Sequence, residues 1–199
     1  MALVFAISGC KKPDDDGGGN GPGTDGPTTN PTGIVVKISN IQGGAPNNIH
    51  NVIASINEEY DNDKIPLWIL DQAEYKNGEC TLTLPATVVS DGLRKIVDAC
   101  EVIDPTVTLS NSDVHWGVVY FDAYDASGKR IGRINDLDYG TMQFNLHVYT
   151  TGNTTVNGTK FDCSFKTGWQ TAYLYSSGNM TTTPPASKPD KDWTWQPWN

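Results

Sequence analysis

The sequence predicts a mainly β protein, a single antiparallel two-sheet β-sandwich with at most one short helix. From Ile34 onward, apolar and polar residues alternate in short runs, which is the period of a strand with one buried face. Most runs are bounded by Gly, Asn, Asp or Pro and recur about every 8–15 residues, a spacing typical of sandwiches. The roughly 165 residues from this point on are enough to bury a two-sheet core.

The first well-defined inward face lies in the run 115–124. Val119, Phe121 and Ala123 form its uniformly apolar side, so we expect them to face the core. The residues 125–129 that follow predict a hairpin connection, in which Gly128 supplies a positive φ. The same alternation places inward Cys80, Leu82 and Leu84, and also Phe161, Cys163 and Phe165. The predicted strands are Ile34–Ser39, His50–Ile56, Leu67–Ile69, Glu79–Leu84, His115–Tyr124, Lys129–Ile134, Met142–Thr150, Lys160–Lys166 and Trp169–Tyr175.

A single stretch, Val89–Cys100, has helical periodicity. Its apolar residues Leu93, Ile96, Val97 and Cys100 have the spacing of one helix face. We expect Ser90 or Asp91 to act as the N-cap, with Gly92 weakening the first turn.

The amino-terminal residues predict an anchor and a tether ahead of the domain. Residues 1–9 are apolar and end in small residues, as the end of a secretory signal does. The run Ile7–Cys10 resembles the lipobox of bacterial lipoproteins, which implies that Cys10 carries a lipid and holds the protein on a membrane. Residues 10–33, rich in Gly, Pro and Asp, predict a disordered tether to a domain at 34–199. Because the leader is short and no Lys or Arg precedes it, the alternatives are a start further upstream or a chance cysteine.

The acidic segment Lys11–Asp16 resembles the export signal that directs lipoproteins of the Bacteroidetes group to the cell surface. This resemblance implies an outer-membrane protein that is anchored by lipid and exposed outside the cell.

Several strands also resemble small Bacteroidetes surface lipoproteins with immunoglobulin-like or related β-sandwich domains, a group whose functions are largely unassigned. The residues that carry the resemblance are Tyr75–Pro85, Gly128–Gly132, Lys166–Trp169 with Tyr173, and the terminal Trp193–Trp195. Cys80 departs from the pattern, which usually has an aromatic residue there. The resemblance implies a location and a fold class and transfers no catalytic residue.

The charge and the cysteines limit the function classes. A formal net charge of −9 argues against a nucleic-acid partner, because phosphate binding needs clustered Lys and Arg. If Cys10 is lipidated, Cys80, Cys100 and Cys163 remain, either as three buried thiols or with one disulfide, for which Cys80–Cys100 is the preferred pair.

Two acidic runs contain residue types that can bind metal. Asp61 and Asp63 alternate with Asn in an expected loop and are weak calcium candidates, and Asp136–Asp138 lies in another expected loop. A solvated acidic loop accounts for both runs, so we expect no metal and no cofactor.

Trp193, Trp195 and Trp198 crowd the last seven residues and are the remaining candidates for ligand contact. In an extended strand the rings of Trp193 and Trp195 project to the same side, which suits a glycan platform. The competing interpretation is a final strand that closes the sandwich with buried rings.

The sequence contains no recognisable nucleophile elbow, phosphate loop or metal-binding His pair, so we expect a protein that is not an enzyme. The expected function is a surface lipoprotein of binding or structural type, with a glycan or an envelope protein as partner. The alternatives are a small surface hydrolase acting on polysaccharide and a subunit of a surface or pilus assembly.

Overall fold

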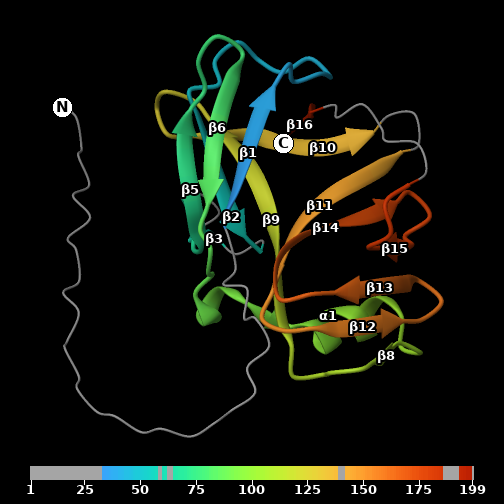
Figure 1. Cartoon of the computed structure of the whole chain (residues 1–199). Coiled ribbons are helices and arrows are strands. Elements are labelled where there is room, and N and C mark those ends of the chain that lie inside the picture. The colour runs from blue at the N-terminus through green and yellow to red at the C-terminus, as the bar shows by residue number, and fades with distance from the viewer. Residues whose placement is uncertain (1–32, 58–59, 62–64, 139–141, 186–192, 199) are drawn as a thin grey trace, which may run out of the picture. The chain divides into compact units, whose positions relative to one another are not determined.

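The protein is mainly β, with sheets of antiparallel strands and one short α-helix, as predicted (Figure 1). The computed structural model describes residues 33–57, 60–61, 65–138, 142–185 and 193–198. Pro31–Asn199 belong to one compact unit. The expected lipid anchor Cys10 and most of the expected tether lie outside the described residues. Within the described ranges, no helix is both long enough and apolar enough to cross a bilayer.

The elements in chain order are β1 (Ile34–Ser39), β2 (Asn51–Ile56), β3 (Tyr60–Asp61), β4 (Ile65–Pro66), β5 (Ile69–Glu74), β6 (Glu79–Leu84), the 3-10 turn η1 (Ser90–Gly92), β7 (Arg94–Lys95), α1 (Ile96–Ile103), β8 (Thr108–Leu109), β9 (His115–Tyr124), β10 (Arg130–Asp138), β11 (Gln143–Thr150), β12 (Thr154–Asn157), β13 (Phe161–Phe165), β14 (Gly168–Tyr175), β15 (Met180–Thr181) and β16 (Trp193–Pro197). The bounds of β1, β6 and β9 are those predicted from the alternation.

One half of the domain, which includes the C-terminal strand β16, is a sandwich. The two-stranded sheet β1–β6 packs on a sheet in which β5, β2, β9 and β10 follow one another and β16 pairs with the other edge of β10 (Figure 1). The predicted inward residues of β6 and β9 are buried in the core between them. This core contains Val36, Ile38, Cys80, Leu82 and Leu84 from one layer and Val52, Ala54, Phe121, Ala123, Ile134 and Trp193 from the other.

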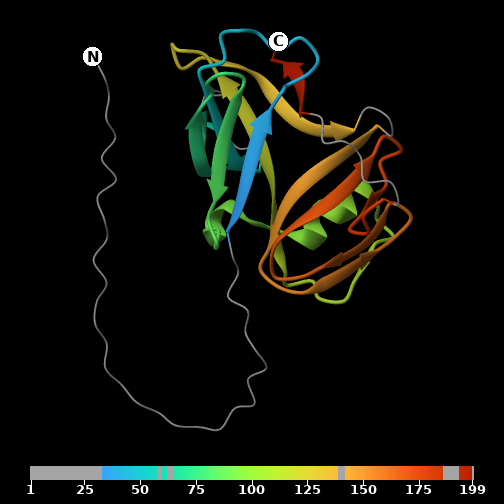
Figure 2. The same ribbon diagram turned by 45° about the horizontal axis from the view of Figure 1, so that its top comes forward.

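The second half is a curved sheet that continues from β9 and β10 instead of forming a separate layer. Residues Trp116–Val118 of β9 pair with β11, and the sheet then runs through β14, β15, β13, β12 and β8. Figure 2 shows α1 lying inside this curve, where Ile96 and Cys100 pack against Phe161, Cys163 and Phe165. The arrangement of sheets therefore differs from two separate layers, and β13–β15 is a parallel pair.

Two local predictions are wrong. The expected strand Leu67–Ile69 covers a bend at 67–68, and β5 begins at Ile69. β5 lies at the edge of the sheet with Gln72 and Glu74 exposed, so its sequence lacks a clear apolar face. The expected loop at 136–138 is the end of β10, which pairs with β16 as far as Asp136 and with β11 beyond it.

The predicted helix begins later than its periodicity indicates. Only Ser90–Gly92 form a 3-10 turn, and the chain is then extended, because Arg94 and Lys95 pair with β9. α1 starts at Ile96, whose N–H donates to the Val114 carbonyl. Long-range strand pairing thus outweighs the local helical pattern.

Candidate functional site

The outer face of β9 carries a fully buried carboxylate. Because Val119, Phe121 and Ala123 face the core, alternation places Tyr120, Asp122 and Tyr124 on the opposite side of the sheet. A lone carboxylate shielded from water is strongly unfavourable unless charged partners compensate it. The partners of Asp122 come from β10, the next strand.

Two arginines hold the Asp122 carboxylate. Oδ1 of Asp122 accepts hydrogen bonds from Nη2 of Arg130 at 2.9 Å and from Nε of Arg133 at 3.1 Å. Arg130 pairs with Tyr124 and Arg133 with Asp122, and a register shift between Arg130 and Gly132 brings both arginines to one face. Burial raises the pKa of the adjacent Tyr124 to about 12, with a further contribution from Asp122, so its hydroxyl stays protonated.

Aromatic rings cover both guanidinium groups. Cζ of Arg130 lies 3.5 Å from the ring centroid of Trp198, and Cζ of Arg133 lies 4.4 Å from that of Tyr120. Each contact has the geometry of a cation–π interaction. Tyr120, Asp122, Arg130, Arg133 and Trp198 therefore form one unit, the arginine–aromatic cluster, in which Trp198 is 49% exposed.

The three C-terminal tryptophans do not lie together. Trp193 and Trp195 project to one side, but that side faces the core: Trp193 is 5% exposed, and its Nε1 donates to the Lys37 carbonyl at 3.0 Å. Trp195 packs over Gly132, where a Cβ would collide with its ring. Of the three candidate contact residues, Trp198 is the one that presents its ring at the surface.

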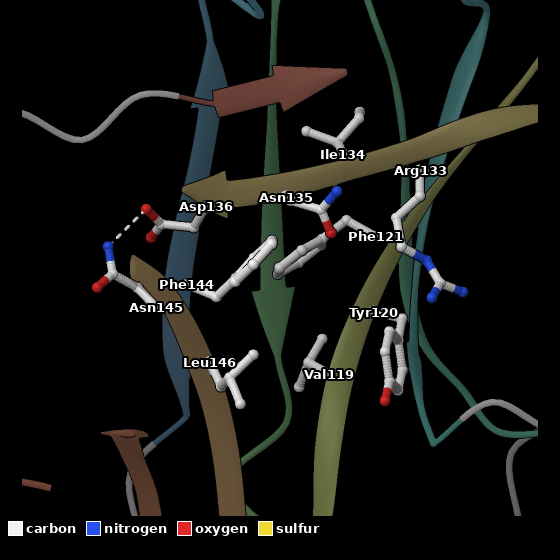
Figure 3. A pocket seen from close by; sticks show the side chains of 10 residues that line it. All are labelled: Val119, Tyr120, Phe121, Arg133, Ile134, Asn135, Asp136, Phe144, Asn145 and Leu146. Carbon is white, nitrogen blue, oxygen red and sulfur yellow. Dashed lines mark hydrogen bonds between the residues drawn. The ribbon is translucent and has the colours of Figure 1, made fainter. Parts of the chain in front are cut away.

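A small hollow opens where β9 leaves β10 to pair with β11. Figure 3 shows it with Phe121 and Phe144 at its centre, and with Arg133 beside Tyr120 on one side. On the other side Nδ2 of Asn145 donates to Oδ1 of Asp136 at 2.8 Å. Its volume of about 40 Å³ can hold a few waters. The hollow is too small for a sugar ring. It is a gap in the packing of β9, β10 and β11.

A chain of buried polar side chains beside the hollow ties β10 to β11. Nε2 of Gln143 donates to Oδ1 of Asn145 at 3.1 Å, which extends the bond from Asn145 to Asp136. Nε2 of His147 lies 3.9 Å from Oδ2 of Asp136, and the His147 ring meets Phe121 edge-on. These contacts fix the junction of the two halves of the domain.

Three connections meet at the end of the sheet where β9 passes into β10. They are residues 40–50, the β5–β6 hairpin at 75–78 and the β9–β10 hairpin at 125–129, all in the upper part of Figure 1. Two adjoining depressions of about 380 and 400 Å³ lie between them and share Asn47 and Ile49. We call these depressions the loop-end grooves. Gly128 has the positive φ predicted for its hairpin.

The three cysteines within the described ranges are free thiols. Burial raises the pKa of Cys80 and of Cys100 to about 11 and that of Cys163 to about 12. Cys80 lies in the core of the sandwich, and Cys100 and Cys163 lie in the core around α1. The alternative of three buried thiols therefore describes this structure.

The weak calcium candidates fall at a gap in the described chain. Asp63 and the side chain of Asp61 lie outside the described residues. Among the residues that are described, no three His, Cys, Asp or Glu side chains come together in a way that could hold a metal ion.

Comparison of the chain with protein-family models, with curated proteins and with solved structures gives no match. The arginine–aromatic cluster and the loop-end grooves are the two candidate sites of the domain. The sequence predicted Trp198 as a contact residue but not the rest of its cluster, and it did not predict the grooves. An Asp inside the aromatic strand Tyr120–Tyr124, with Arg130 and Arg133 just beyond the hairpin, indicates a buried ion pair.

Proposed function

We propose that this protein is a surface lipoprotein, anchored in the outer membrane through a lipid on Cys10, whose folded domain binds an extracellular glycan. The observation that carries the proposal is the half-exposed ring of Trp198 above the buried guanidinium of Arg130. The apolar C–H face of a sugar ring packs well on an aromatic ring, and the buried guanidinium beneath Trp198 holds that ring in place.

The rigidity of the cluster supports a binding role. Asp122 is fully buried and holds Arg130 and Arg133 in fixed positions on a sheet, so few side-chain rotations are lost when a ligand arrives. Preorganised groups on strands bind more tightly than the same groups on mobile loops.

The anchor is supported by the sequence alone, through the lipobox-like run that ends at Cys10. A lipid at this position, followed by a tether, would present the domain to material outside the cell. The anchor is tested by partitioning into detergent: the wild-type chain should enter the detergent phase, and a Cys10→Ser variant should stay in the aqueous phase.

Glycan binding is tested with an array of oligosaccharides probed with the full chain, followed by titration of a positive glycan. We expect Trp198→Ala to weaken binding about tenfold, the equivalent of about 1.4 kcal/mol. Val102→Ala is the control, because Val102 is also a large exposed side chain but lies on α1. The proposal is wrong if no glycan binds, or if Trp198→Ala and Val102→Ala bind as the wild type does.

A further inference from the structure

We infer that the loop-end grooves bind a neutral sugar chain and form the part of the glycan site that recognises hydroxyl groups. This inference rests on the proposed function and adds to it a second surface and a ligand class. Its starting point is the convergence of the 40–50, 75–78 and 125–129 connections at one end of the sheet (Figure 1).

Side-chain amides dominate the polar groups of the grooves. Asn40, Asn47, Asn48 and Asn77 line them, and all four are exposed. None of these amides makes a side-chain hydrogen bond with another described residue. An amide donates through its nitrogen and accepts through its oxygen, and a sugar hydroxyl also does both, so the two groups are complementary.

The charge in the grooves disfavours an acidic ligand. The carboxylate lining them belongs to Asp125, whose Oδ1 accepts from the N–H and the hydroxyl of Ser127 and from the N–H of Lys129 at 2.6–3.0 Å. These bonds, the Ser127 hydroxyl first, lower the pKa of Asp125, so it stays ionised at neutral pH. The charge of Lys129 partly offsets this carboxylate, and the remaining negative charge disfavours uronates and sulfated sugars relative to neutral ones.

The grooves also have an apolar base. Ile49 is buried beneath both depressions, and Ala45 and Pro46 are half-buried beside it. Tyr75 is held in place because its hydroxyl donates to the Gly78 carbonyl at 2.9 Å. Such a base suits the C–H faces of sugar rings, and the two depressions, of about 380 and 400 Å³, are open to solvent, so an extended sugar chain can lie along them.

Backbone hydrogen bonds cross-link the three connections. Asn40 donates to the Gly78 carbonyl, Tyr75 to that of His50, and His50 to that of Tyr124, at 2.8–3.3 Å. These bonds fix both ends of the 40–50 connection, which limits the freedom that it loses on binding.

The grooves and the arginine–aromatic cluster share one hairpin. Residues 125–127 line a groove, and the same hairpin leads from Tyr124 into Arg130, beneath Trp198. The N–H of Trp198 donates to the carbonyl of Ile131 on the same strand as Arg130. A sugar chain bound on Trp198 would therefore lie at the same end of the sheet as the loop-end grooves.

The experiment compares the full chain with an Asn47→Ala/Asn48→Ala variant and a Trp198→Ala variant. Neutral oligosaccharides of glucose, mannose, xylose and galactose, together with oligogalacturonate as the acidic probe, are titrated by calorimetry. We expect a neutral oligosaccharide to bind and the double variant to bind it at least about tenfold more weakly. Asn179→Ala is the matched control, an amide in the β14–β15 turn, and should bind as the wild type does.

The melting temperature of the double variant should equal that of the wild type, because the two amides make no hydrogen bond within the described structure. If Trp198→Ala weakens binding and the double variant does not, the inference about the grooves is overturned and the proposed function stands. Binding of oligogalacturonate alone also overturns the neutral ligand class. If none of these sugars nor any other glycan binds, the proposed function itself fails.

Discussion

Replacing Asp122 by Asn removes the negative charge that two arginines share. The Asp122 and Arg130 side chains are 0% and 3% exposed, so the solvent can do little to compensate the change. Breaking a buried ion pair by removing one partner costs about 3–5 kcal/mol of unfolding free energy. Because both bonds end on Oδ1 and the amide oxygen of Asn can still accept them, we expect a loss near the lower end, about 3 kcal/mol.

Glu79→Gln is the matched control, since it makes the same chemical change in another strand. Glu79 Oε2 lies 2.6 Å from Nζ of Lys37, a shorter contact than those of Asp122, but the Lys37 and Glu79 side chains are 58% and 52% exposed. An exposed pair contributes less than about 1 kcal/mol. Urea unfolding monitored by circular dichroism measures both variants, with the slope m checked for constancy. If Asp122→Asn loses no more stability than Glu79→Gln, the argument that burial makes this pair important is refuted.

Two further predictions concern acid stability and thiol reactivity. Hydrogen bonds from Thr106 above all, and from Thr159 and Lys160, lower the pKa of Asp104 well below its ordinary value. Its contribution to stability is therefore present above about pH 4 and is lost as the pH falls further. Urea midpoints measured from about pH 7 to about pH 2.5 should fall less steeply for Asp104→Asn than for the wild type, and parallel curves would contradict this. Ellman's reagent at about pH 8 should leave the core thiols unmodified in the folded Cys10→Ser variant and label them in guanidinium, because burial raises their pKa values to about 11 or 12; labelling within minutes in the folded state would contradict the burial. These thiols are Cys80, Cys100 and Cys163.

Elements with a clear period of two could be predicted from the sequence, and elements formed by pairing alone could not. In β1, β6 and β9 apolar and polar residues alternate over six residues or more, so the sequence predicts their bounds and inward faces. The strands β7, β8 and β15 have two residues each, too few to show any period. They exist because a neighbouring strand offers hydrogen bonds, as β9 does for Arg94 and Lys95.

The candidate site shows the same division. Alternation assigns Asp122 to the face opposite Phe121, but whether that face meets water depends on Arg130 and Arg133, which a bulge brings to it. The loop-end grooves depend on three connections that are far apart in the chain. A local sequence pattern cannot predict that these connections come together.

The sequence by itself determined which side chains share a face, including those of Trp193 and Trp195 in the last strand. The tertiary structure decided that this shared face is covered by β1, where the Lys37 carbonyl accepts a hydrogen bond from Trp193. It also decided that Trp198 lies over Arg130. The reason is physical: the period of a strand is a property of its own backbone, whereas burial depends on the layer that packs against it. For β16 that layer is β1, which lies at the opposite end of the chain.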